Sequence, residues 1–271
     1  MPELPEVETT RRGIAPFIID QKLIKVIVRN RQLRWPVPRG LNRLLVGHVI
    51  TTVERRAKYL LLRLDDGCLI MHLGMSGSIR ITRQDAPPEK HDHVDLIFES
   101  GSVLRFRDPR KFGSILWTTG DPFSHELLSH LGPEPLSAAF NGKYLYEKTR
   151  GRKQSIKTFM MDSRMVAGIG NIYANEALYL AGILPRRQAG RLSLERCKKL
   201  VDAVKQVLKK AIKAGGTTLR DFSSGEGQPG YFYLKLKVYD RMGEPCGRCG
   251  GPVKHAVIGQ RSTYYCTQCQ K

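Results

Sequence analysis

The sequence contains no long apolar run, and nowhere does it approach the roughly 20 consecutive apolar residues that a membrane-spanning helix requires. Its first eight residues, "MPELPEVE", lack the basic and apolar regions of a secretory signal. No internal repeat and no low-complexity segment is visible. We therefore expect a cytoplasmic protein with no membrane partner, whose thiols stay reduced.

Cysteine is scarce outside the C-terminal tail. Four of the six cysteines lie within residues 246–271, whereas Cys68 and Cys197 stand alone. This distribution is unlike the disulfide framework of a small secreted protein. Cys197 falls on the apolar face of a predicted helix, so we interpret it as a buried core thiol.

Acidic residues are few relative to basic ones. The chain has 25 Asp and Glu against 45 Lys and Arg, which gives a net charge of +20 over 271 residues. A folded surface with this excess attracts polyanions. Because the basic residues are spread along the chain rather than gathered in one tail, nucleic acid is favoured over a membrane surface as the partner.

The first part of the chain has the pattern of antiparallel β-structure. Short apolar or alternating runs predict strands at residues 25–29, 59–64, 68–73, 94–99, 102–107 and 114–117. The turn sequences "DDG" and "SG" join two pairs of these runs as hairpins. One early helix, "EVETTRRGI", is expected to begin at Pro5 and to end near Gly13 and Pro16. We therefore expect these strands to form an antiparallel sandwich or barrel.

From about residue 121 the pattern becomes helical. Apolar residues recur at helical spacing from Leu194 to Ile212, and Gly215 provides a stop. A second helix enters through "GIGN" and ends at Gly182 and Pro185. Residues 223–230 are turn formers and predict a mobile loop. The expected fold class is α+β, with domains at 1–120, 121–236 and 237–271.

The tail contains two CxxC pairs, "CGRC" at 246–249 and "CTQC" at 266–269. Four thiolates at this spacing are typical of a closed structural zinc site formed by Cys246, Cys249, Cys266 and Cys269. Two disulfides or a redox CxxC pair are the alternatives. The residues between the pairs predict a hairpin whose tip offers Gln260 and Arg261, either as a nucleic-acid contact or as solvated turn residues.

Two further segments could contact DNA. Glycines before the helix at "GIGN" leave backbone N–H groups open to a phosphate, with Asn171 as a cap or donor, although an ordinary capped helix has the same pattern. The loop "FRDPRKFG" places Arg110 beside Phe112, as in a wedge that enters a duplex. Phe112 could equally cover the core, and Met75 in "HLGMSGS" allows the same two interpretations.

The amine at the start of the chain is a candidate nucleophile. If Met1 is removed, Pro2 presents a secondary amine, and an α-amine titrates near pH 8 rather than near 10.4 as lysine does. Attack on a sugar C1′ with ring opening would give an iminium ion, an electron sink. Glu3 and Glu6 lie beside it as proton donors or acceptors. A frayed chain end is the alternative.

The motifs "MPELPEVETTRRGI", "RRAKYLLL", "HLGMSGS", "KHDHVD", "DPRKFG", "LGPEPL", "GIGNIYANEAL", "GGTT" and the four-cysteine tail together resemble the bacterial formamidopyrimidine-DNA glycosylases. The resemblance covers nearly the whole chain. It implies an enzyme that excises oxidised purines, chiefly 8-oxoguanine and formamidopyrimidines, and nicks the strand by β- and δ-elimination. It also implies an N-terminal β-sandwich, a helix-two-turn-helix domain and a zinc-finger hairpin.

The resemblance also implies roles for individual residues. Pro2 is expected to be the Schiff-base nucleophile and Glu3 the general acid/base. Lys58 matches the proton donor of β-elimination, and Arg261 matches that of δ-elimination.

The remaining matched positions imply contacts with DNA. His91, Arg110 and Arg152 match DNA-binding residues, with Lys153 as an alternative to Arg152. Met75, Arg110 and Phe112 match the residues that fill the gap left by an everted base, Lys157 and Asn171 match phosphate and active-site contacts, and Thr217–Gln228 resembles a loop that covers the lesion. The implied partner is double-stranded DNA with oxidised purines or abasic sites, bound by a monomer with one structural zinc in the bacterial cytoplasm.

Two other functions fit part of the sequence. An endonuclease VIII-like glycosylase shares the layout but acts on oxidised pyrimidines, and "PELPE" rather than "PEGPE" favours the purine branch. A non-catalytic zinc-ribbon protein that binds damaged DNA would leave Pro2, Glu3 and Lys58 without a role.

Overall fold

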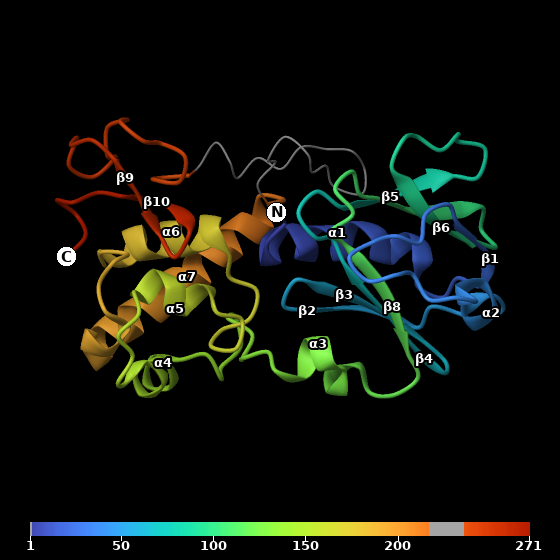
Figure 1. Ribbon diagram of the computed structural model, residues 1–271, viewed down its shortest axis with the longest axis horizontal. Helices are drawn as coiled ribbons and strands as arrows, with labels where there is room; N and C mark the ends of the chain where they lie inside the picture. The colour runs from blue at the N-terminus through green and yellow to red at the C-terminus, as the bar shows by residue number, and fades with distance from the viewer. Residues whose placement is uncertain (1, 217–235) are drawn as a thin grey trace. The chain divides into compact units, whose positions relative to one another are not determined.

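The computed structural model describes residues 2–216 and 236–271 (Figure 1). This part of the chain divides into two compact units, one formed mainly by residues up to Ser129 and the other mainly by His130–Lys213 with the C-terminal residues. Among the described helices, none is both long and apolar enough to cross a membrane. The expected loops at 223–230 and Thr217–Gln228 lie outside the described residues.

The first unit contains two four-stranded antiparallel sheets. One has the strand order β1-β6-β7-β5 and consists of Leu23–Val28, Asp92–Phe98, Ser102–Arg107 and Ser78–Arg83. The other has the order β2-β3-β4-β8 and consists of Thr52–Arg56, Tyr59–Leu64, Gly67–His72 and Ser114–Thr118. Both sheets contribute to one buried apolar cluster, which makes this unit the expected sandwich.

The predicted strands and both predicted hairpins are confirmed. The structure also contains β2 and β5, which the sequence pattern did not predict. In β2 only Val53 is buried, because the other side chains of "TVERR" are polar and remain at least partly exposed. In β5 the sequence "SIRITR" buries only Ile79. Such strands are stabilised by pairing with their neighbours rather than by a strong apolar pattern of their own.

The first helix, α1, spans Leu4–Ile18, so the expectation that Gly13 and Pro16 end it is wrong. Pro16 lies in the last turn, where its missing N–H removes a single backbone hydrogen bond. Ile14 and Ile18 are fully buried against the sandwich, and this packing outweighs the lost bond. A short second helix, α2 (Leu41–Leu45), also precedes the second sheet, although only one early helix is expected from the sequence.

The second unit is helical and ends in a hairpin. Its helices are α4 (Gly142–Thr149), α5 (Ile156–Met161), α6 (Asn171–Ala181) and α7 (Leu194–Lys213); its strands are β9 (Lys254–Ile258) and β10 (Arg261–Tyr265). The short helix α3 (Glu126–Ser129) closes the first unit. Both long predicted helices are confirmed: α6 ends at Gly182 with φ +69°, α7 ends before Gly215 with φ +78°, and Cys197 is fully buried.

Candidate active site and DNA interface

The N-terminal residues are held at the start of α1. Pro2 is buried, and Glu3 and Glu6 are each only 2% exposed. Glu3 is the N-cap of the helix: its N–H donates to the Glu6 carboxylate at 2.8 Å, and its own carboxylate accepts from the Glu6 N–H in a capping box. Because the unpaired N–H groups of a helix start favour carboxylates, both acids are fixed at the start of α1, which Pro2 directly precedes.

Lys58 lies in the two-residue turn between β2 and β3 and is half-buried. Its neighbour Ala57 has φ +54°, in the left-handed region. One residue near this turn was missed by the sequence analysis: the His72 ring lies 4.7 Å from the Tyr59 ring. Burial, with the positive charges of Lys58 and Arg34, lowers the pKa of His72 to about 4, so the imidazole is neutral at pH 7.

Met75, Arg110 and Phe112 come together on two adjacent loops that Asp108 ties to each other. The Asp108 carboxylate accepts from the Ser76 hydroxyl at 2.8 Å and from the Gly113 N–H at 2.7 Å. The Arg110 guanidinium lies 5.0 Å from the centre of the Phe112 ring. Asp108 is fully buried, and the sequence analysis assigned it no role although it lies inside "DPRKFG".

Phe112 is 43% exposed, so the interpretation that it covers the core is wrong. Gly74 explains how closely the two loops approach, since a Cβ there would lie 2.4 Å from the Phe112 carbonyl carbon and φ is +64°. Met75 is half-buried. Exposed aromatic and cationic groups held on a rigid frame suit contact with unstacked bases and phosphates.

His91 is joined to the same loops. Its carbonyl accepts from the Asp108 N–H at 3.1 Å, and its φ of +77° lies in the left-handed region. Desolvation, followed by the positive charges of Lys90, His93, Arg107 and Lys111, lowers the pKa of His91. An imidazole surrounded by cations is placed where an anion would bind.

In the second unit, the hairpin that carries Arg261 is held by two other predicted residues. The Lys157 ammonium donates to the Ser262 carbonyl at 2.8 Å and to Thr263 Oγ1 at 2.7 Å. Asn171 Nδ2 donates to the same Ser262 carbonyl at 3.0 Å. Lys157 is fully buried, whereas Arg261 is exposed at the start of β10. The structure thus brings these three predicted residues together.

Arg152 and its alternative Lys153 are both exposed in the turn between α4 and α5. The Arg152 carbonyl accepts from the Gly190 N–H at 2.9 Å, which fixes the backbone of this turn. Either cation is accessible to a phosphate.

The four tail cysteines form a cluster that fits one zinc ion. Their sulfur atoms all lie within 4.8 Å of one another. Cys249 and Cys266 have sulfurs 3.4 Å apart, and those of Cys246 and Cys269 are 3.8 Å apart. Tetrahedral zinc with bonds of about 2.3 Å requires a sulfur separation of about 3.8 Å. All six cysteines are free, so the disulfide alternative does not hold.

Helix α6 fastens the zinc-finger segment to the rest of this unit. The Tyr179 hydroxyl lies 3.2 Å from Cys246 Sγ, and Asn175 Oδ1 accepts from the Tyr264 N–H at 2.8 Å. The Glu176 carboxylate accepts from three consecutive N–H groups, of Lys237, Val238 and Tyr239, each at 2.9 Å. Burial raises the pKa of Glu176. The sequence analysis did not identify these three α6 residues, although Asn175 and Glu176 lie in "GIGNIYANEAL" and Tyr179 directly follows it.

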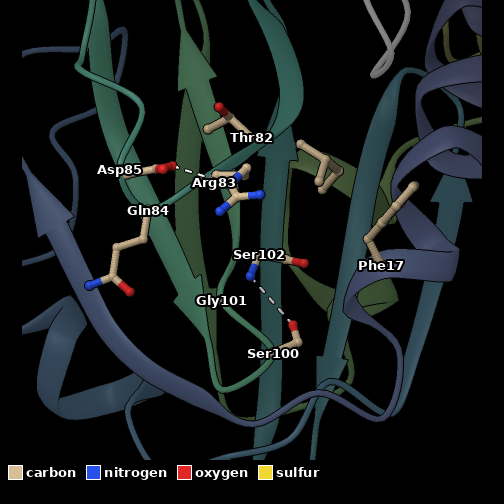
Figure 2. A pocket seen from close by; sticks show the side chains of 9 residues that line it. Phe17, Thr82, Arg83, Gln84, Asp85, Ser100, Gly101 and Ser102 are labelled. Atoms are coloured by element: carbon tan, nitrogen blue, oxygen red, sulfur yellow. Dashed lines mark hydrogen bonds and ion pairs between the residues drawn. The ribbon is translucent and has the colours of Figure 1, made fainter.

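The first unit also has a surface pocket (Figure 2). It is lined by the end of β5, the β6–β7 turn and Phe17, and Arg83 pairs with Asp85 at 3.3 Å on its rim. It contains none of the predicted site residues.

Three family models match the chain. The formamidopyrimidine-DNA glycosylase N-terminal domain matches residues 1–115, the H2TH domain of the same family matches 131–223, and the zinc finger found in FPG and IleRS matches 243–271. Together they span both units and the hairpin.

Curated relatives and solved structures agree with these models. Formamidopyrimidine-DNA glycosylases of Syntrophotalea carbinolica and Methylococcus capsulatus are 59% and 56% identical over 271 residues, with full coverage of both chains. A Lactococcus lactis FPG mutant in complex with a Fapy-dG containing DNA superposes with a TM-score of 0.93 at 37% identity, covering 100% of each chain. MutM (FPG) from Thermus thermophilus superposes with a TM-score of 0.88 at 38% identity, covering 99% of this chain and 98% of that one. The chain therefore belongs to the formamidopyrimidine-DNA glycosylase family.

Proposed function

We propose that this enzyme excises oxidised purines from double-stranded DNA with the Pro2 amine as its covalent nucleophile. As a family member it is a DNA glycosylase and abasic-site lyase of base excision repair. The observation that carries the assignment of Pro2 is its place at the start of α1, with Glu3 and Glu6 fixed beside it. The mechanism requires removal of Met1, because an acylated proline nitrogen has no lone pair to donate.

The chemistry follows from a secondary amine next to carboxylates. Pro2 attacks C1′ as the bond to the damaged base breaks, and the sugar ring opens to give an iminium ion between nitrogen and C1′. Loss of a C2′ proton then expels the 3′ phosphate, and a second elimination expels the 5′ phosphate. We assign proton transfers to Glu3, proton donation in the first elimination to Lys58, and proton donation in the second to Arg261.

The target nucleotide must leave the helix stack before C1′ can be attacked, at a cost of a few kcal/mol. We propose that Met75, Arg110 and Phe112 fill the gap, since they share one rigid two-loop frame. His91 and either Arg152 or Lys153 would hold phosphates.

We propose that Asn171 and Lys157 contact the DNA at the hairpin that carries Arg261, which both residues hold. Zinc, when bound, holds the four thiolates together and so keeps the hairpin folded. Because Lys157 is fully buried, its main effect on DNA would pass through Ser262 and Thr263.

The remaining assignments are also proposals. We place the domain boundaries at 1–120, 121–236 and 237–271, and expect a monomer in the bacterial cytoplasm, bound to the nucleoid through DNA. These assignments rest on the two changes of sequence pattern and on the excess of basic residues.

A panel of duplexes with single lesions tests the substrate assignment. Each duplex carries 8-oxoguanine, a formamidopyrimidine, an oxidised pyrimidine or an undamaged base opposite its normal partner. We expect nicking of the two purine lesions at least about tenfold faster than of the pyrimidine lesion, equivalent to about 1.4 kcal/mol of transition-state free energy. The opposite ranking would indicate an endonuclease VIII-like enzyme. Tight binding without nicking of any lesion would indicate the damage-binding protein.

A further inference from the structure

We propose that the ion pair between Glu8 of α1 and Arg55 of β2 positions Lys58 for catalysis, a role that rests on the proposed function of Lys58. Arg55 is a positioning residue here, because no substrate contact is needed for it to act. The inference comes from a chain of contacts that starts on the helix carrying Pro2 and ends at the residue before Lys58.

Two nitrogen atoms of the Arg55 guanidinium donate hydrogen bonds to two different partners. Its Nε donates to the Glu8 carboxylate at 3.1 Å, and its Nη1 donates to the Ala57 carbonyl at 2.9 Å. The side chains of Arg55 and Glu8 are both only 11% exposed. A guanidinium with spaced donors can make both bonds at once, whereas the compact ammonium of a lysine cannot.

The turn that receives this bond is conformationally unusual. Ala57 has φ +54°, and a residue with a Cβ persists in the left-handed region only when surrounding contacts hold it there. The Ala57 carbonyl belongs to the peptide group that continues into Lys58. The bond from Arg55 therefore fixes the direction in which the chain enters Lys58.

Glu8 anchors the other end of the link. Its carboxylate also accepts from Arg11 Nη2 at 2.9 Å and from Arg12 Nε at 2.8 Å. Burial alone would raise the pKa of Glu8, but hydrogen bonds from Arg11 and Arg12 and the charges of Arg11 and Arg55 lower it to about 2. The anchor is thus charged at every pH at which the enzyme would work.

Helix α1 begins at Leu4, two residues after Pro2, the proposed nucleophile. Glu8 is the fifth residue after Glu3, which places it about 7.5 Å further along the helix. One rigid helix therefore has Pro2 at its start and, through Glu8 and Arg55, the Lys58 turn at its side. We infer that the Glu8–Arg55 pair sets the position of the proton donor relative to the nucleophile.

The test separates formation of the covalent intermediate from strand cleavage. On a duplex with one preformed abasic site, under single-turnover conditions, borohydride trapping reports the Schiff base and gel analysis reports the nick. For Arg55→Met and Arg55→Lys we expect nicking to slow by about tenfold to a hundredfold, the range that small misplacements of a catalytic group produce. Trapping should stay within about twofold of the unmodified enzyme. Thermal melting is followed for each variant, and Arg55→Lys serves if Arg55→Met does not fold.

The matched control is Arg12→Met. Arg12 also donates a hydrogen bond to Glu8. Its side chain is 59% exposed, and this bond does not reach the turn at Ala57 and Lys58. We expect it to trap and nick at the unmodified rates. Equal slowing by Arg12→Met and Arg55→Met would show a general effect on stability and overturn the proposal.

A double-mutant comparison decides whether Arg55 acts through Lys58. If it does, adding Arg55→Met to Lys58→Ala causes no further loss of nicking; a full additional loss overturns the inference. Normal nicking by Lys58→Ala alone would instead refute the role of Lys58 in the proposed function. Slow nicking by Lys58→Ala with normal nicking by both Arg55 variants would refute only the positioning role.

Discussion

Glu8 shows how one buried carboxylate can organise several basic side chains. It lies among Arg11, Arg12 and Arg55, and the first two come from its own helix. Removing the shared carboxylate would take one ionic partner from the mostly buried Arg55, and losing one partner of a buried pair costs more than the pair contributes. The cluster therefore contributes to the stability of the sandwich as well as to the geometry near Lys58.

The lowered pKa of Glu8 predicts a specific pH dependence for Glu8→Gln. The carboxyl titrates at about 2 in the folded protein and at 4.5 ordinarily, so its contribution is present above pH 4.5 and is lost as the pH falls through 2. We expect the variant to be less stable at pH 7 by about 2 kcal/mol. Urea unfolding from pH 7 to pH 3 should show this difference shrink below pH 4.5.

Glu54→Gln is the control for the urea-unfolding series. Glu54 forms a more exposed ion pair with Arg63, and both lie on the sheet that also carries Arg55. Exposed pairs contribute little, and we expect its unfolding free energy to stay within about 1 kcal/mol of the unmodified protein at every pH. A stability difference for Glu8→Gln that does not change between pH 7 and pH 3 would contradict the assignment.

At the scale of elements, α6 connects the zinc finger to the helical unit. Asn171, Asn175 and Tyr179 recur every four residues, so they share one face of the helix and meet the hairpin and the cysteine cluster in turn. Losing the metal should therefore loosen the finger from this face and leave α6 itself folded.

Cys246→Ser tests this arrangement. We expect loss of stoichiometric zinc and a DNA affinity weakened by roughly tenfold, about 1.4 kcal/mol, because the hairpin with Arg261 loses its support. Zinc content and binding to a duplex with a non-cleavable abasic analogue are the measurements. Cys197→Ala, which changes a buried thiol far from the ligands in sequence, should keep zinc and affinity. Unchanged affinity in zinc-free Cys246→Ser would contradict the supporting role of the metal.

The elements differ in how far the sequence could predict them. Helix α7 and the cysteine cluster follow from local patterns, the 3.6-residue period and the CxxC spacing, and both were predicted. The continuation of α1 through Pro16 and the existence of β2 depend on packing and pairing with distant segments. Those partners cannot be read from the local sequence.

The same limit applies to the site. Candidate residues such as Pro2 and Arg110 can be identified in the sequence by the chain terminus, the charge pattern and the family resemblance. Asp108, Glu176 and Arg55 do not, because each acts through hydrogen bonds to segments that the chain sequence alone does not bring together. Supporting residues of this kind are visible only once the fold is known.

At the scale of the whole molecule, the net charge of +20 is consistent with DNA as the partner, but not every basic residue is available to it. Arg105 is 3% exposed and pairs with Asp95 at 2.9 Å; Arg29 pairs with the same carboxylate at 2.6 Å, and Arg80 pairs with Asp92 at 2.8 Å. These arginines fasten β5, β6, β7 and the residue that follows β1 to one another. The DNA-binding field must therefore come from the remaining cations, among them the exposed Arg110, Arg152 and Arg261.

The role of the Pro2 amine is tested most directly by borohydride trapping on a duplex with one 8-oxoguanine opposite cytosine, followed by mass mapping of the cross-linked peptide. Protein mass first establishes that Met1 is absent, and a binding assay establishes that the duplex is bound. We predict a single cross-link, on the Pro2 nitrogen, and its loss when borohydride is omitted. A cross-link on a lysine, or strand cleavage with no trapped species, would contradict the role of the Pro2 amine.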